Sequence, residues 1–191
     1  MGLRISVADD ERSSIAIFER LLPKCGHTVV STSADGLELL HAVSVHEPDL
    51  VITDIRMPRM DGLIALEQIK RRFGTPVIIL SGYHDTKYVE AACVHNVMAY
   101  LTKPASIGAL SATIPVAMKQ HKDYASLRTQ LEERKILERA KGILMMKYGV
   151  NEGEAWKLLL KEATAQHLKP AAFAESIIHT HRLESGLQAT G

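Results

Sequence analysis

The sequence of 191 residues lacks any apolar run of the roughly 20 residues that a helix needs to span a bilayer. Its first segment, MGLRISVADDERSS, carries acidic residues where a signal peptide would keep an apolar stretch. Only two cysteines occur, Cys25 and Cys93, and neither has a metal ligand at CxxC or CxxH spacing. We therefore expect a cytoplasmic protein without a membrane partner, in which both thiols stay reduced.

A large excess of either charge is also missing, because the formal net charge is only +1. Through Met118 the chain contains 11 Lys and Arg against 13 Asp and Glu, whereas from Lys119 onward the counts are 12 and 9. The two parts thus carry charges of −2 and +3. This asymmetry is compatible with a C-terminal part that binds nucleic acid, but many solvated helices are equally basic.

Five short runs of β-branched or apolar residues in the first half fit buried strands: LRISVA, HTVVST, DLVITD, PVIILS and MAYLT. Segments with helical periodicity separate them, for example around Tyr88, Ala91 and Ala92. Such alternation indicates a parallel sheet that helices cover on both faces. The right-handed crossover rule favours the strand order 2-1-3-4-5. We therefore predict a doubly wound, five-stranded α/β domain over residues 1–118.

The strand pattern stops after Pro104, and the rest of the chain has helical periodicity. Pro115 lacks the N–H that a helix interior uses, so either the helix bends there or a new helix begins with Pro115 in its first turn. An apolar stripe runs from Ile114 to Leu131. It makes residues 119–133 a helical linker that either pairs with a second copy as a short coiled coil or packs on its own domain.

Residues 134–191 are expected to form a small three-helix domain. Gly149 is a natural end for the first helix. Asn151 and Glu154 have the spacing of a capping box at the start of the second, and Pro170 suits the first turn of the third. Three apolar side chains near the end of the first helix are expected in the core: Ile143, Met145 and Met146.

Acidic residues follow two strands that the predicted order makes neighbours. Asp9 and Asp10 come after the first strand, and Asp54 ends the third. Ligands bind at this carboxyl edge of a doubly wound sheet, next to the point where the strand order reverses. Three carboxylates would repel one another there unless a cation lies among them. Oxygen ligands in an incomplete shell favour Mg²⁺.

Two further polar residues belong to the same edge, because Ser81 ends the fourth strand and Lys103 follows the fifth. A carboxylate nucleophile, a divalent cation, a hydroxyl and a lysine together make a phosphoryl-transfer site, with Asp54 as the attacking group. Each feature alone is common at a strand end. Their occurrence at four separate strand ends favours a functional site.

The motifs ADDE, TDIRMPRMDG, ILSGY and AYLTKP resemble the receiver domain of two-component response regulators, over residues 1 to about 118. The resemblance implies that Asp54 accepts a phosphoryl group from a histidine kinase or phosphotransfer protein. It implies a signalling regulator that assists its own phosphorylation and dephosphorylation and is no independent enzyme.

The same resemblance implies roles for individual residues. Asp10, Asp54 and the backbone carbonyl of Arg56 would bind Mg²⁺ directly, and Asp9 would act through water. Three further residues would stabilise the phosphate and switch the domain: Ser81, Tyr100 and Lys103.

The segment ERAKGILMMKYGVNEGEAWKLLLKEATAQHLKPAAFAESII is similar to the ANTAR domain, a three-helix RNA-binding module of transcription antitermination regulators. The similarity implies binding of a paired-hairpin RNA in a nascent transcript, and we expect a homodimer in the active state. Five basic side chains are the candidate RNA contacts: Arg139, Lys141, Lys161, His167 and Lys169. Lys141 and Lys169 are expected to be exposed.

Two alternatives remain for the C-terminal part. The first is a DNA-binding response regulator whose last helices form a helix-turn-helix. The spacing of four to five residues and the absence of a tight glycine turn between the second and third helices argue against it. The second is a scaffold whose helices bind only protein. Salt-dependent retention of RNA would distinguish the scaffold from the two interpretations in which this part binds RNA or DNA.

Overall fold

The computed structural model describes residues 2–82 and 98–188, without the side chains of Ser81 and of residues 184–188. The chain divides into two compact units, Met1–Asp123 and Tyr124–Gly191. The helix expected around Tyr88, Ala91 and Ala92, and the thiol of Cys93, lie outside the described residues. Within the described ranges, no helix combines the length and the apolar character that a bilayer crossing would need.

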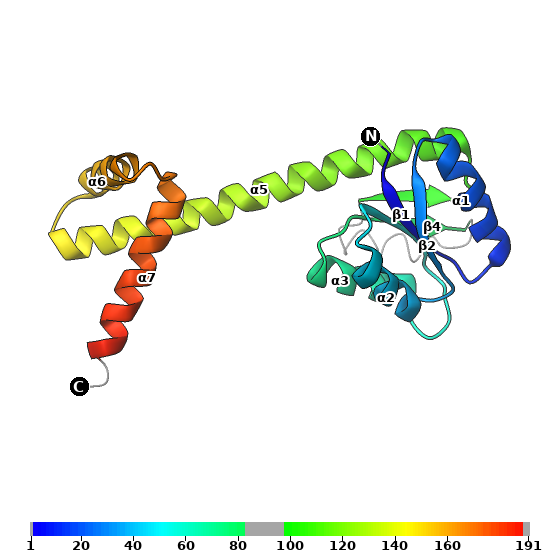
Figure 1. The fold of residues 1–191 in the computed structure, drawn as a ribbon, viewed down its shortest axis with the longest axis horizontal. Helices are drawn as coiled ribbons and strands as arrows, with labels where there is room; N and C mark the ends of the chain where they lie inside the picture. Colours follow the sequence, from blue (N-terminus) through cyan, green and yellow to red (C-terminus); the bar gives the residue numbers. More distant parts are fainter. Residues whose placement is uncertain (1, 83–97, 189–191) are drawn as a thin grey trace. The chain divides into compact units, whose positions relative to one another are not determined.

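A five-stranded parallel sheet forms the centre of the first unit (Figure 1). Its order is β2-β1-β3-β4-β5, which confirms the predicted topology. The central strand β3 is buried along its whole length, as expected for a strand that helices cover on both faces. The strand bounds are β1 Arg4–Ala8, β2 Thr28–Ser33, β3 Leu50–Asp54, β4 Val77–Ser81 and β5 Ala99–Thr102.

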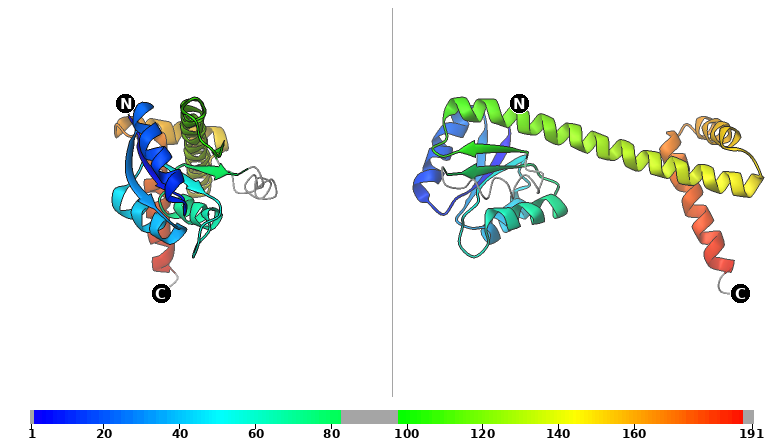
Figure 2. Two further views of the ribbon diagram at one scale, coloured as in Figure 1. Left: turned by 90° about the vertical axis from the view of Figure 1, so that its right-hand side faces the viewer. Right: turned by 180° about the vertical axis from the view of Figure 1, so that it is seen from behind.

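Helices cover both faces of this sheet, and each face has its own hydrophobic core (Figures 1 and 2). On one face pack α1 (Arg12–Lys24) and the first turns of α5 (Ile107–Tyr148); on the other pack α2 (Gly36–His46) and α3 (Gly62–Arg72). Alternate side chains of β3 pack in the two cores, with Ile52 in the core on the α1 side. Each such fully buried side chain contributes about 1.5–3 kcal/mol.

The helix α5 is continuous from Ile107 to Tyr148 and contains Pro115, so no new helix begins at that proline. Ile114 and Ala117 on either side of it are buried in the core of the first unit. Their packing holds the helical path although one backbone hydrogen bond is lost at the proline. The predicted linker, residues 119–133, lies inside this helix.

The second unit contains the end of α5, followed by α6 (Glu152–Ala165) and α7 (Pro170–Gln188). The three predicted boundaries are confirmed. Gly149 has a left-handed φ of 66° directly after α5, Asn151 and Glu154 form a reciprocal capping box, and Pro170 opens α7. The core of this unit consists of small and aliphatic side chains: Ala140, Leu144, Ala155, Leu159 and Ala174.

The expectation that Met145 and Met146 belong to this core is wrong. Met146 is 78% exposed and Met145 is also exposed, while Ile143 is only half-buried. The buried positions of α5 are Ala140 and Leu144, which are four residues apart and so share one face of the helix. Met146 lies two residues beyond Leu144 and therefore points away from that face.

Candidate functional site

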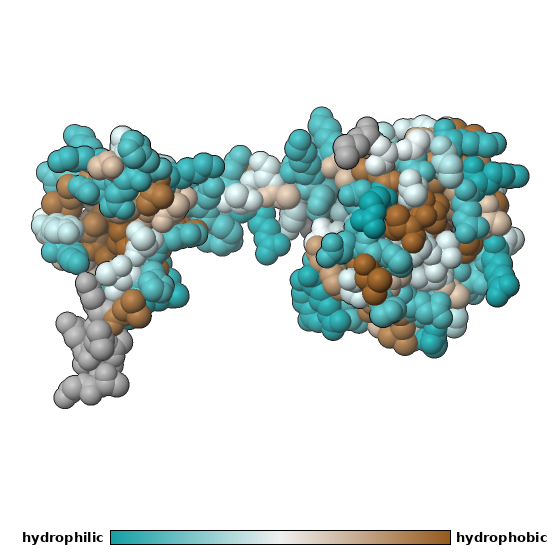
Figure 3. Space-filling view, in the orientation of Figure 1, coloured by the Kyte–Doolittle hydropathy of each residue, from teal (hydrophilic) through white to brown (hydrophobic). Residues whose placement is uncertain are grey.

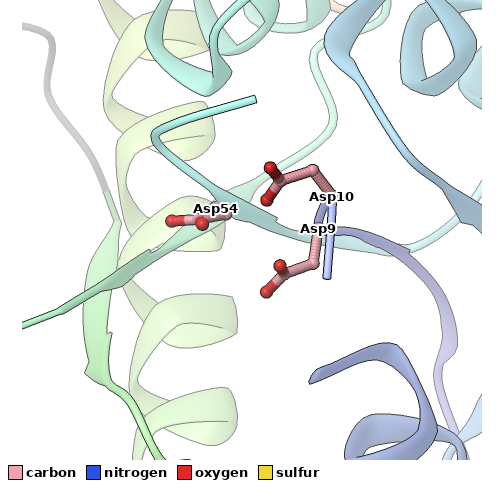
Figure 4. A group of neighbouring side chains, drawn as sticks. All are labelled: Asp9, Asp10 and Asp54. Atoms are coloured by element: carbon pink, nitrogen blue, oxygen red, sulfur yellow. The ribbon is translucent and has the colours of Figure 1, made fainter. Parts of the chain in front are cut away.

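The carboxylates of Asp9, Asp10 and Asp54 converge at the carboxyl edge of the sheet (Figure 4). The parallel register pairs Ala8 with Thr53, so the residues that follow these two positions emerge side by side. One oxygen from each carboxylate lies within 4.8 Å of the other two. Asp9 and Asp54 are buried, whereas Asp10 is exposed. The cluster is therefore a pocket of oxygen ligands with one side open to water.

Lys103 joins this cluster from the end of β5. Its Nζ lies 2.7 Å from Oδ2 of Asp9 and 2.7 Å from Oδ2 of Asp54. One ammonium offsets only one of three carboxylate charges, so ionised side chains leave an excess of two negative charges. A divalent cation would balance that excess, and a set of oxygen donors with room for water suits Mg²⁺.

The two partners of the Lys103–Asp54 pair have pKa values above their ordinary range. Burial raises the pKa of Asp54 and the neighbouring Asp9 charge adds to this, although Lys103 and the Ile55 N–H, which donates to Oδ1 at 2.7 Å, act in the opposite direction. Burial alone would lower the pKa of Lys103, but the carboxylates of Asp54 and Asp9 outweigh it and raise that pKa. Lys103 thus remains a cation beside a carboxyl that binds a proton more readily than usual.

The other expected members of this site are only partly described. Arg56 lies two residues after Asp54 with an exposed side chain. Tyr100 is half-buried in β5 and packs against the core under α2 and α3. Ser81 ends β4 and pairs with Thr102 of β5, but its side chain lies outside the described atoms. The roles of Arg56, Ser81 and Tyr100 stay predictions.

Gly62 and Arg59 are features of this edge that the sequence argument does not identify. A Cβ at Gly62 would lie 1.9 Å from the carbonyl oxygen of Asp54, so only glycine permits this approach of α3 to the end of β3. Arg59, in the loop between β3 and α3, forms ion pairs with Asp35 and Glu38 at the start of α2. The TDIRMPRMDG motif contains both residues, but the partners of Arg59 lie outside it.

Lys141 is not the exposed residue that the sequence analysis expects. It is 9% exposed, and its Nζ lies 2.9 Å from Oε1 of Glu138 and 2.7 Å from Oε1 of Glu152. The hydrogen bonds to Glu152 and Glu138 raise the pKa of Lys141, and Lys141 in turn lowers the pKa of Glu152. Because Glu152 opens α6, this lysine ties α5 to α6 and is poorly placed to contact a ligand.

The other four candidate contacts of the C-terminal unit are exposed: Arg139, Lys161, His167 and Lys169. Lys157, which the sequence argument overlooks, is also exposed and lies one turn before Lys161 on the same face of α6. Trp156 beside it is 37% exposed. In the described part of the chain, Lys157, Lys161 and Lys169 form no ion pair with a carboxylate. Their charges remain available to an anionic partner.

Two family models match this sequence. The model of the response regulator receiver domain matches residues 5–115, and that of the ANTAR domain matches residues 125–178. The transcriptional regulatory protein PdtaR of Mycobacterium tuberculosis is 33% identical over 184 residues, which cover 93% of this chain and 90% of PdtaR. The transcriptional regulatory protein HptR of Staphylococcus aureus is 39% identical over 103 residues, which cover 53% of this chain and 40% of HptR.

Solved structures resemble the first unit. A response regulator receiver domain protein from Clostridium thermocellum has a TM-score of 0.58 at 31% identity, over 64% of this chain and 98% of that one. NtrX from Brucella abortus has a TM-score of 0.61 at 27% identity, over 71% of this chain and 30% of that one.

The acidic cluster generates a prediction about Mg²⁺. Asp10→Asn should weaken Mg²⁺ binding at least about tenfold, because even outer-shell partners of metal ligands typically contribute 10–100-fold. The melting temperature of the metal-free protein should not fall, since the change relieves carboxylate repulsion.

Isothermal titration calorimetry on the wild type should also show the affinity for Mg²⁺ falling as the pH drops through the raised pKa of Asp54, because protons compete for that carboxylate.

Asp123→Asn is the matched control, because Asp123 is an exposed acid of α5 outside the cluster. It should bind Mg²⁺ like the wild type. Equal affinity in Asp10→Asn and the wild type would contradict the site.

Proposed function

The chain belongs to the response regulators that carry a receiver domain and a C-terminal ANTAR domain, and on that premise we propose that phosphorylation of Asp54 controls its binding to RNA in transcription antitermination. The observation that carries the first half is the buried Asp54 carboxylate with Lys103 at 2.7 Å, beside two further acids. The proposed receiver covers residues 1–118, the linker residues 119–133 and the RNA-binding domain residues 134–191. The proposed location is the cytoplasm.

The proposed phosphoryl transfer begins from a phosphohistidine on a histidine kinase or phosphotransfer protein. A carboxylate oxygen of Asp54 attacks the phosphorus, the bond from phosphorus to the histidine nitrogen breaks, and the released nitrogen takes a proton from water. The product is an acyl phosphate on Asp54. Lys103, which contacts the Asp54 carboxylate before transfer, can then pair with oxygens of the phosphoryl group. Attack of water on the phosphorus reverses the modification and releases phosphate.

Asp10, Asp54 and the backbone carbonyl of Arg56 would hold Mg²⁺ directly, and Asp9 would do so through water. When bound, the ion would neutralise negative charge on the transferring oxygens. The exposure of Asp10 leaves this side of the cluster open to the incoming donor. Ser81 and Tyr100 would report the phosphorylated state, the first through its hydroxyl and the second through its aromatic ring.

The proposed RNA contacts lie on the exposed surface of the C-terminal unit. Side chains cannot easily read the deep, narrow groove of duplex RNA, whereas loop bases can stack on aromatic rings. Trp156 offers such a ring next to Lys157 and close in sequence to Lys161. Arg139, His167 and Lys169 complete the proposed set, and Lys141 is reassigned to a structural role because of its burial between two acids.

Asp54 should be the phosphoacceptor. Incubation with a small phosphodonor and Mg²⁺ should add one phosphate to the wild type and to Asp123→Asn, and none to Asp54→Ala, which lacks the attacking oxygen. Intact-protein mass spectrometry measures the addition directly. Equal labelling of Asp54→Ala would show that the phosphate goes elsewhere.

The exposed lysines should bind RNA, and hairpin-loop RNA should bind more tightly than duplex DNA of similar length. Lys161→Ala and Lys169→Ala should each weaken the binding of RNA. Each should also make the negative slope of log affinity against log salt shallower by about 0.7–0.9, the change expected for the loss of one phosphate contact. Affinities for a paired-hairpin RNA, a scrambled RNA and a DNA duplex at two salt concentrations test this. Lys122→Ala, an exposed lysine of α5, is the control.

Two outcomes would favour the alternatives. Tighter binding of the DNA duplex would favour a DNA-binding regulator. Absence of salt-dependent binding to any of the three nucleic acids would favour a scaffold that binds protein.

Phosphorylation should promote self-association through the linker. Tyr124, Leu127 and Leu131 are 46%, 59% and 59% exposed, and their spacing of three and four residues places them on one side of α5. Sedimentation with and without a phosphate mimic should show a dimer mainly with the mimic. Leu127→Glu should abolish the dimer, whereas Thr129→Glu, at another exposed position of α5, should retain it. A monomer in both states at high concentration would refute the proposal.

A further inference from the structure

Arg59 has a backbone conformation that arginine rarely adopts. Its φ is 61°, in the left-handed region that glycine enters at little cost. It lies in the loop of residues 55–61, which follows Asp54 and leads into α3. A non-glycine residue persists in this conformation only where its surroundings impose it. The contacts of the Arg59 side chain identify those surroundings.

The guanidinium of Arg59 binds two carboxylates at the start of α2, those of the N-cap Asp35 and of Glu38. Its Nε donates to Oδ2 of Asp35 at 2.6 Å, Nη2 contacts the same oxygen, and Nη2 also donates to Oε1 of Glu38 at 2.7 Å. Arginine suits this arrangement because its donors form a planar, rigid fork, which the single ammonium of lysine cannot reproduce. We name this group of three residues, Arg59, Asp35 and Glu38, the loop clamp.

Both acids of the loop clamp are already fixed by the N-terminus of α2. Oδ1 of Asp35, which is buried, accepts the N–H groups of Leu37 and Glu38 at 2.8 and 3.0 Å and so caps the helix. Oε2 of Glu38 accepts the N–H of Ala34 at 3.0 Å. The free oxygen of each acid faces Arg59, so the guanidinium binds a preformed receptor on a helix end.

The backbone of the loop is held at the same place. The N–H of Gly36 donates to the carbonyl of Met60 at 3.0 Å, and a Cβ at Gly36 would lie 2.7 Å from that carbonyl oxygen. At the other side, the N–H of Gly62 donates to the carbonyl of Ile55 at 2.8 Å. The segment between Asp54 and Gly62 is therefore fastened to the start of α2, and its two ends are joined to each other.

We propose that Arg59 is a positioning residue for the Asp54 site, and that the loop clamp fixes the loop backbone from which Arg56 offers its carbonyl to Mg²⁺. The contacts described for Arg59 are with Asp35 and Glu38 rather than with Asp9, Asp10 or Asp54, so it acts through the backbone. This inference rests on the proposed phosphorylation of Asp54. Loss of the loop clamp raises the Mg²⁺ concentration that the site requires.

The test compares three variants. Arg59→Gly accepts the left-handed backbone but removes the side chain, and Arg59→Lys keeps a charge without the fork. Asp35→Asn keeps an oxygen that can cap α2 and removes the negative charge. For each, the rate of phosphorylation by a small phosphodonor is measured against Mg²⁺ concentration, together with the melting temperature.

Arg59→Gly should raise the Mg²⁺ concentration for half-maximal rate about tenfold, the lower end of the usual outer-shell effect. The rate at saturating Mg²⁺ should change less, and Arg59→Lys should fall between Arg59→Gly and the wild type. The double variant Arg59→Gly/Asp35→Asn should require no more Mg²⁺ than Arg59→Gly alone, because both changes remove one shared interaction. Lys135→Gln, which breaks an exposed ion pair with Glu132 on α5, should leave the Mg²⁺ requirement unchanged.

A purely structural role would lower the melting temperature of Arg59→Gly and Arg59→Lys without moving the Mg²⁺ requirement, and that result overturns the proposal. Failure of Asp54 phosphorylation in the wild type is a separate outcome that contradicts the proposed function. If phosphorylation fails, calorimetric titration of the wild type and of Arg59→Lys with Mg²⁺ still tests the inference, because it does not depend on phosphorylation. Equal Mg²⁺ affinities of the two proteins would refute the inference.

Discussion

Repulsion among three carboxylates at one edge of a parallel sheet is the constraint on which the first domain depends. The register of β1 against β3 brings Asp9 and Asp54 together. Lys103 offsets one charge, and the buried Asp54 retains a raised pKa. The fold thus holds a cluster in an unfavourable charge state, which a divalent cation would relieve. Relief of the repulsion that the fold itself creates would contribute to the binding of such an ion.

A second buried aspartate of the same domain shows the opposite balance. Burial alone would raise the pKa of Asp35, but the N–H groups of Glu38 and Leu37 and the guanidinium of Arg59 lower it. Asp35 is a fully satisfied anion, whereas Asp54 shares one lysine with Asp9. The satisfied acid suits a fixed anchor, and the incompletely balanced one suits a group that reacts. Asp35 binds Arg59 of the loop that follows Asp54, so we assign the positioning of this loop to the first acid and the phosphoryl chemistry to the second.

The parts that could be predicted from the sequence are those that local rules decide. Continuous apolar strands together with the right-handed crossover rule predicted the sheet order, strand-end acids predicted the cluster, and Gly149 and Asn151 predicted helix ends. The errors concern side chains whose surroundings come from distant segments. Lys141 is buried because Glu152 of α6 folds back over it, and Met146 is exposed because α6 and α7 cover another face of α5. The two partners of Arg59, Asp35 and Glu38, lie 24 and 21 residues away, beyond any local pattern.

The continuity of α5 gives the proposed switch its physical basis. This one helix supplies Ile114 to the core of the first unit and Leu144 to the core of the second. Between them, the exposed stripe of Tyr124, Leu127 and Leu131 belongs to neither core. Three apolar side chains in less than three turns bury too little surface for a strong coiled coil. The proposed pairing is therefore weak by itself, and a small change in the receiver's preference for pairing suffices to shift the equilibrium.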